Sequence, residues 1–260
     1  MNFVRLAVVI SFLCFIGCPA YCTDRDRSSL SLVLTFHTAP VNRAGFRKEL
    51  EETVLREFEQ MRQGSTLQAY TVLFSRYVDD AGWDAMILAT FSNEAGLAAW
   101  KNLEESAPAG LSAKALSLIT NINTAPADLI QDKAAAQGQN SPVFLVIPYE
   151  IAVPGDEYTA YLSGYVVPQL DGWMGEGILV RYRIYLARYP AGRPWQSLLV
   201  LEYKSQEALG SREATVAKVR ARLKENAEWK ALSDNKKTIR VEKAATIADP
   251  LYQGSTNSRH

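Results

Sequence analysis

Cysteine and histidine are both scarce in this chain of 260 residues. Its three cysteines, Cys14, Cys18 and Cys22, all lie near the start, and its two histidines are His37 and His260. Beyond Cys22 the absence of cysteine excludes disulfides, thiol nucleophiles and cysteine-ligated clusters. A metal site built from side chains usually needs several histidine, cysteine or carboxylate ligands. We therefore predict no metal site.

The first residues have the pattern of a secretory signal. A single positive charge, Arg5, precedes an apolar run over residues 6–17 that only Ser11 interrupts, and small residues and charges follow. The run is about a dozen residues long, shorter than the roughly 20 that a spanning helix needs. Residues 1–22 are therefore predicted to be a signal peptide cleaved near Cys22. This predicts an exported protein, periplasmic or secreted, without a transmembrane helix after cleavage. Lipid attachment at Cys18 is the alternative.

The charges are balanced, with 28 basic and 28 acidic residues, and 48% of the residues are apolar. This composition is typical of a globular protein and gives no indication of a nucleic-acid partner. The one basic stretch, at 218–224, is interleaved with glutamates and is best explained as a solvated helix face. No glycine-rich phosphate loop, serine-hydrolase elbow or zinc-protease motif is present.

An internal repeat organises the chain. Residues 70–97 align without a gap on residues 182–209, which is an offset of 112. Such self-similarity indicates a duplicated module. The best shared mark is an Arg-Tyr pair followed six residues later by tryptophan, namely Arg76, Tyr77 and Trp83 in one copy and Arg188, Tyr189 and Trp195 in the other.

The repeat predicts the domain boundaries. We expect a first module at 30–130, a small and polar linker at 131–142, a second module at 143–252 and a flexible tail at 253–260.

Each copy predicts the same order of elements. In the first copy these are a strand at 30–36, a helix along 46–61, two strands joined by a turn, a helix at 94–105 and a strand at 116–123. In the second copy the corresponding ranges are 143–151, 158–166, two strands, 211–232 and 238–245. Pro168 is expected to kink or end the first helix of the second copy. The order βαββαβ is that of a ferredoxin-like module, so the predicted fold class is α+β.

Two such modules in tandem, with the strand-to-helix segment Leu199–Leu209, resemble the dimeric alpha-beta barrel superfamily. The resemblance covers about residues 30–252 and implies two ferredoxin-like units packed sheet to sheet. Members include antibiotic-biosynthesis monooxygenases, EthD-like and NIPSNAP-like proteins, haem-degrading monooxygenases and chlorite dismutases. The resemblance implies a fold more than an activity. A fused tandem already supplies the pairing of the two sheets, which predicts a monomer.

Alternation along the strands nominates a polar set. Arg183, Tyr185 and Glu202 share one face of their strands, and Glu150 on the preceding strand would join them. If this face is inside the barrel, the set is a candidate ligand site, because isolated buried charges are costly. Alternatively, Arg183 and Glu202 form a silent cross-strand ion pair, or the set faces solvent. The equivalent positions in the first copy are Thr71, Leu73 and Thr90, so any polar pocket would be formed mainly by the second copy.

His37 occupies the place of Glu150 in the repeat. It is a weak candidate for a general base or a haem ligand, and the alternative is a hydrogen-bonded residue at the strand end. For the repeated Arg-Tyr-Trp set we expect a structural role. Each tryptophan would cover the hairpin end, with the arginine stacked on it or reaching a carboxylate.

Three functions remain open from the sequence. The leading expectation is an exported protein that binds a small, largely apolar molecule between its two sheets, without a cofactor. The second is a cofactor-independent or haem-using monooxygenase-like enzyme, which would be favoured if His37 pointed into a cavity beside Arg183 or Tyr185. The third is a structural domain that binds a protein partner, recognisable by a packed interior and an exposed apolar patch.

Overall fold

Nine strands form one sheet, eight of which close into a barrel, in the computed structural model, which describes residues 29–135 and 141–255. The predicted signal peptide at 1–22 lies outside the described residues. The strand order is β7-β6-β4-β1-β3-β2-β9-β5-β8, and a further pairing of β7 with β5 closes a ring of eight. Their bounds are β1 Ser29–Thr38, β2 Leu67–Ser75, β3 Ala85–Phe91, β4 Ile119–Ala134, β5 Val143–Ile151, β6 Leu179–Ala187, β7 Ser197–Tyr203, β8 Arg240–Glu242 and β9 Thr246–Ser255.

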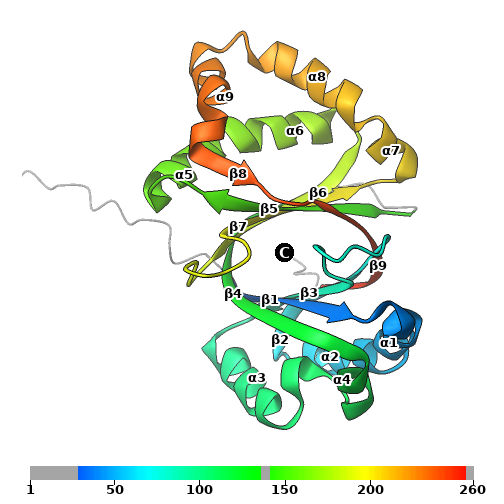
Figure 1. The fold of residues 1–260 in the computed structure, drawn as a ribbon. Helices are drawn as coiled ribbons and strands as arrows, with labels where there is room; N and C mark the ends of the chain where they lie inside the picture. Colours follow the sequence, from blue (N-terminus) through cyan, green and yellow to red (C-terminus); the bar gives the residue numbers. More distant parts are fainter. Residues whose placement is uncertain (1–28, 136–140, 256–260) are drawn as a thin grey trace, which may run out of the picture.

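Helices cover the barrel on two sides (Figure 1). Helices of the first half lie on one side: α1 Arg43–Glu49, the π-helical turn η3 Leu50–Val54, α2 Leu55–Gln63, α3 Glu94–Ser106 and α4 Ala113–Leu118, with short 3-10 turns η2 Pro40–Asn42 and η4 Pro108–Gly110. Those of the second half lie opposite: α5 Gly155–Tyr161, the π-helical turn η5 Leu162–Val166, α6 Val167–Gly175, α7 Gln206–Gly210, α8 Arg212–Leu223 and α9 Ala227–Ile239. None of the helices in the described ranges is long and apolar enough to cross a membrane.

The barrel consists of two four-stranded halves with matching order. The first half runs β4-β1-β3-β2, and the second runs β9-β5-β7-β6. All pairs are antiparallel. The halves meet at two seams, where β4 pairs with β6 and β2 pairs with β9.

The last strand of each half is longer or later than the sequence predicts. The predictions of strands at 116–123 and 238–245 were wrong in their ends, because β4 runs to Ala134 and β9 occupies Thr246–Ser255. The extra length of β4 has a partner outside its own half, since residues 127–134 pair with β6. The expected linker at 131–142 therefore starts inside a strand, and the expected tail at 253–260 starts inside another.

The first helix of each half contains a π turn at the same place in the repeat. The amide of Leu55 donates to the carbonyl of Leu50, and the amide of Val167 donates to that of Leu162, again an offset of 112. Pro168 does not end its helix, which was one of the two outcomes expected, and α6 continues to Gly175. Proline lies in the first turn after the π turn, where a missing N–H is tolerated.

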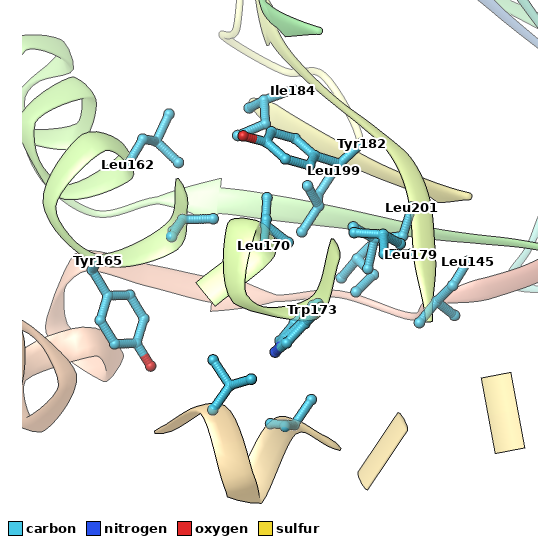
Figure 2. Packing of buried hydrophobic residues seen from close by; sticks show 14 of the residues in the cluster. Leu145, Leu162, Tyr165, Leu170, Trp173, Leu179, Tyr182, Ile184, Leu199 and Leu201 are labelled. Atoms are coloured by element: carbon cyan, nitrogen blue, oxygen red, sulfur yellow. The ribbon is translucent and has the colours of Figure 1, made fainter. Parts of the chain in front are cut away.

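Three apolar clusters stabilise this arrangement, one between each helical layer and its strands and one inside the barrel. In the second half, Leu170 and Trp173 of α6 lie over Leu179, Leu199 and Leu201 of the strands (Figure 2). The interior cluster contains buried side chains from both halves: Val33, Leu73, Met86, Leu88, Ala125, Ala127, Phe144, Val146, Tyr185, Trp195, Leu198, Val200 and Ala248.

Helices α6 and α8 approach closely at Gly172. A Cβ there would lie 2.4 Å from Val219 Cγ1, whereas a Cβ at Gly175 would meet nothing within 4 Å. We therefore expect Gly172→Ala to lower the free energy of unfolding by about 1–3 kcal/mol through overpacking. Gly175→Ala, three residues further along the helix, should raise it by about 0.5 kcal/mol. Urea titrations of both variants check this, and equal effects would contradict the close approach.

Candidate functional site

The polar set predicted from strand alternation lies inside the barrel. Tyr185 belongs to the interior cluster, while its neighbours Tyr182 and Ile184 face the helices. Arg183 is 5% exposed and Glu202 is 1% exposed. These three side chains come from β6 and β7, which are adjacent strands of the second half.

Arg183 reaches across the barrel to the first half. Its Nη1 donates a hydrogen bond of 2.9 Å to Thr71 Oγ1, and these two residues occupy equivalent positions of the repeat. The alternative of a cross-strand ion pair between Arg183 and Glu202 would join residues that are diagonal, and not directly opposite, across β6 and β7. A bulge between Leu179 and Arg181 shifts the register, so that Glu202 lies opposite Arg181 and Arg183 lies opposite Val200. The second terminal nitrogen, Arg183 Nη2, is buried and has no hydrogen-bond partner.

A surface ion pair extends the polar set to the rim of the barrel. Arg181 donates to both oxygens of Asp132 on β4, over 2.7 and 2.6 Å. The two side chains are 24% and 32% exposed. Hydrogen bonding to Asp132 raises the pKa of Arg181 although burial opposes it, and the charge of Glu202 adds to the rise. The polar set thus runs from solvent into the interior.

Tyr185 supplies a second buried donor. Burial raises the pKa of its phenol, and the nearby charge of Arg183 offsets part of that rise. The phenol therefore remains protonated at neutral pH and can donate a proton to an acceptor. Arg183 lies beside the hydroxyl and favours its ionised form through its charge and a side-chain contact, although the contact lacks the geometry of a normal hydrogen bond.

Two adjacent donors, Arg183 Nη2 and the Tyr185 hydroxyl, are thus buried without an acceptor. A buried donor left unsatisfied costs about 1–3 kcal/mol, and more when it is charged. Such groups are uncommon in folded proteins, but the helix-facing core of the second half holds others, among them the hydroxyls of Tyr158, Tyr161 and Tyr165. A bound molecule with an acceptor oxygen would satisfy both. The interior of the barrel is filled by apolar side chains, and Tyr185 belongs to the same buried cluster.

Glu150 does not join the interior set. Its side chain is 56% exposed and forms an ion pair of 2.5 Å with Lys243. It lies near the end of β5, where the strand pairs with the short β8. Strand alternation alone could not reveal that the strand has left the barrel wall there.

His37 lies far from Arg183 along the sheet. It pairs with Asn121 on β4, whereas Arg183 pairs with Asp132, eleven residues further along the same strand. This is a path of roughly 36 Å along the strand. The arrangement that would favour an enzyme, with His37 beside Arg183 or Tyr185, is therefore not present.

The surroundings of His37 do not fit a haem. The half-buried side chain lines a surface cleft of about 390 Å³ together with Asp79, Asp80 and Asp84. Asp84 is already bonded to the amide and hydroxyl of Thr38 and to Arg43. A haem macrocycle needs an apolar slot beside its axial ligand. His37 is the only histidine in 29–135 and 141–255, and within these ranges no cluster of three or more metal-ligating side chains occurs.

The repeated arginines join the two halves. Arg76 forms an ion pair of 2.5 Å with Asp249 on β9, and Arg188 forms one of 2.7 Å with Asp128 on β4. Each arginine thus reaches a carboxylate on the other half, the second of the two roles considered for it. Arg76 and Asp249 also line a cleft of about 830 Å³ with Lys204 and Glu207, in which the central charges are already paired.

The aromatic residues of the repeated Arg-Tyr-Trp set lie in two different environments. Trp195 is buried in the interior cluster and Trp83 packs against it. Tyr77 and Tyr189 are 64% and 70% exposed. The tryptophans therefore fill the barrel interior and are not stacked by the arginines.

Sequence reasoning missed Arg181 and Asp132. Alternation places Arg181 on the face of Arg183, which is a usable signal. Asp132 could not be found in this way, because it lies in the segment predicted to be a linker.

Structural comparison identifies the fold, while no family model and no curated protein matches the sequence. A protein of Fusobacterium nucleatum, provisionally assigned as a monooxygenase, gives a TM-score of 0.60 at 13% identity, covering 88% of this chain and 95% of that one. Another with the same provisional assignment, from Lactobacillus acidophilus, gives 0.58 at 11% identity, covering 88% and 96%. A chlorite dismutase mutant from Candidatus Nitrospira defluvii gives 0.51 at 11% identity, covering 86% and 91%. The chain has the fold of the dimeric alpha-beta barrel superfamily.

The seam between the halves can be tested at Asp249. We expect Asp249→Asn to lower the melting temperature by about 1–3 °C, because partly exposed ion pairs contribute up to about 1 kcal/mol. Asp234→Asn, which removes the exposed partner of Lys230, is the control and should change little. A double-mutant cycle with Arg76→Met, followed by calorimetry, isolates the pair. A coupling energy of zero would contradict its role at the seam.

The acceptor of Arg183 can be tested at Thr71. We expect Thr71→Val to lower the free energy of unfolding by about 1–3 kcal/mol, because it leaves the buried guanidinium without its hydrogen bond. Thr35→Val is the matched control, since its hydroxyl makes only a long contact of 3.5 Å to the Asn123 carbonyl. Denaturant titrations measure both variants. Equal losses would show that the Arg183–Thr71 bond contributes nothing specific.

Proposed function

We propose that this protein binds a small, largely apolar molecule at the polar end of its barrel interior. One observation carries the proposal, namely that Arg183 Nη2 and the Tyr185 hydroxyl are buried side by side without an acceptor. The Arg181–Asp132 pair at the rim marks the route from solvent. The apolar walls next to the donors, among them Leu73 and Val200, would contact the body of the ligand.

This proposal explains more than its rivals. A purely structural domain would account for the packed middle of the barrel, but it would not supply an acceptor for the guanidinium nitrogen Arg183 Nη2. An enzyme of the monooxygenase type finds support in the fold alone, and its candidate base, His37, is remote from the polar set. Ligand binding therefore remains the function that the geometry supports best.

We also propose that the two halves are copies of one ferredoxin-like module. The matching strand order, the π turns at an offset of 112 and the reciprocal arginine–aspartate pairs support this. A further proposal is that residues 1–22 direct export and are removed near Cys22, with lipid attachment at Cys18 as the alternative.

Native mass spectrometry of the full chain, expressed with its own amino terminus and recovered from the periplasm, tests binding and export together. We expect a mass that begins after Cys22 and an additional non-covalent mass lost on denaturation. Tyr185→Phe should reduce the occupancy by several-fold, because it removes one of two buried donors. Tyr189→Phe, at the exposed equivalent of Tyr77, is the control and should leave the occupancy unchanged.

Two results would count against these proposals. A protein without any bound mass, in which Tyr185→Phe changes neither stability nor ligand uptake, would contradict binding. A mass that retains residues 1–22, or that carries a lipid at Cys18, would contradict cleavage near Cys22.

A further inference from the structure

We infer that the surface cleft at the seam between β2 and β9 binds a small organic anion, namely a carboxylate with an apolar body. The cleft has a volume of about 830 Å³, and both halves of the chain line it. Arg76 comes from the first half, while Lys204, Gln206 and Glu207 come from the second. This site is separate from the polar set inside the barrel, so the inference does not depend on the proposed function.

The acceptor groups of the cleft are already in use. The carboxylate of Asp249 accepts from Arg76 Nε over 3.2 Å and from Arg76 Nη2 over 2.5 Å. The side-chain carbonyl of Gln206 accepts from Arg76 Nη1. Hydrogen bonds from the Ser205 side chain and from its own amide lower the pKa of the Glu207 carboxyl, so this group is ionised at neutral pH. A ligand rich in hydrogen-bond donors would therefore compete with donors that are already in place.

Two donor groups of the cleft have no acceptor in the parts of the chain that the structure describes. The ammonium of Lys204 forms no ion pair or hydrogen bond there. Because the carbonyl oxygen of Gln206 faces Arg76, its amide nitrogen carries two N–H groups that no described residue accepts. A carboxylate has two oxygens and can accept from both groups, and hydrogen bonds to ionised partners are the stronger ones. The hydrogen-bond inventory thus favours an anion.

The charges of the cleft permit an anion without attracting it strongly. Arg76 and Asp249 neutralise each other, and Lys204 is balanced by Glu207. Because Lys204 is exposed, an ion pair with it should raise the affinity only about two- to five-fold. Further affinity must come from apolar contact, and the cleft has apolar walls of Pro142, Val143 and Pro250. A carboxylate with an apolar body therefore fits this cleft better than an inorganic anion.

The two donors are particular to this seam. At the offset of 112, Ser92 and Glu94 occupy the positions of Lys204 and Gln206. The arginine–aspartate pair, in contrast, occurs at both seams. A glutamate at position 206 would still accept from Arg76, but it would offer no N–H group and would add a negative charge. Gln206→Glu is therefore the substitution that keeps the contact to Arg76 and removes the donor.

Three probes test the class of ligand: benzoate, an anion with a ring; acetate, an anion without one; and benzylamine, a ring with a positive charge. NMR titrations of the purified full chain at constant ionic strength measure their affinities. We expect benzoate to bind at least about five-fold more tightly than acetate, because its ring buries apolar area against the walls. Benzylamine should bind more weakly than benzoate.

Substitutions locate the binding. Lys204→Met should weaken the binding of benzoate about three-fold, because it removes one exposed cationic donor. Gln206→Glu should weaken it about five-fold or more, because it removes a donor and brings a like charge against the carboxylate. Lys101→Met removes an exposed lysine of α3 that does not line the cleft, and as the control it should leave the affinity unchanged.

Several results would overturn the inference. These are a failure of benzoate to bind, benzylamine binding as tightly as benzoate, acetate binding as tightly as benzoate, and an equal effect of Lys101→Met and Lys204→Met. Tyr185→Phe should not change the affinity for benzoate. If it did, benzoate would bind inside the barrel, which would support the proposed function and contradict binding at the cleft.

Discussion

The rest of this structure depends on the last strand of each half, which pairs within its own half and also with a strand of the other half. β4 leaves the first half to pair with β6, and β9 of the second half pairs with β2. These seams close the barrel and leave no open edge among its eight strands, which removes a common route to aggregation. They also bring Arg76 to Asp249 and Arg188 to Asp128. The facing of Thr71 and Arg183 inside the barrel is a consequence of the same closure.

The sequence alone predicts the order of elements but not the reach of the last strands. The Arg-Tyr-Trp spacing reveals the repeat, and apolar periodicity locates the helices. The segment after residue 123 contains Pro126, which argues against a continuing strand. In the structure Pro126 lies on β4 close to the point where pairing with β6 begins, and its carbonyl accepts from the amide of Arg188. That partner is 62 residues away, and no local pattern indicates it.

The candidate site could be predicted in its composition but not in its pairing. Alternation placed Arg183, Tyr185 and Glu202 on one face, because side chains on a strand alternate strictly. The bulge after Leu179 then moved Glu202 opposite Arg181. A shift of one residue in register is invisible in the sequence, yet without it Glu202 would lie opposite Val180, on the other face from Arg183. His37 and Glu150 lie outside the interior set for another reason. Both residues are near strand ends, where side chains reach solvent.

The asymmetry of the halves explains why this site would need a single fused chain. Positions 71 and 183 are equivalent in the repeat and lie within hydrogen-bond distance of each other across the barrel. In a symmetric pair of identical modules, an arginine at this position would face a second arginine in a buried place, and two like charges there would repel strongly. Duplication allows one copy to carry threonine, which accepts a hydrogen bond from the arginine of the other. The lone guanidinium can then be held inside the barrel with one nitrogen directed at Thr71.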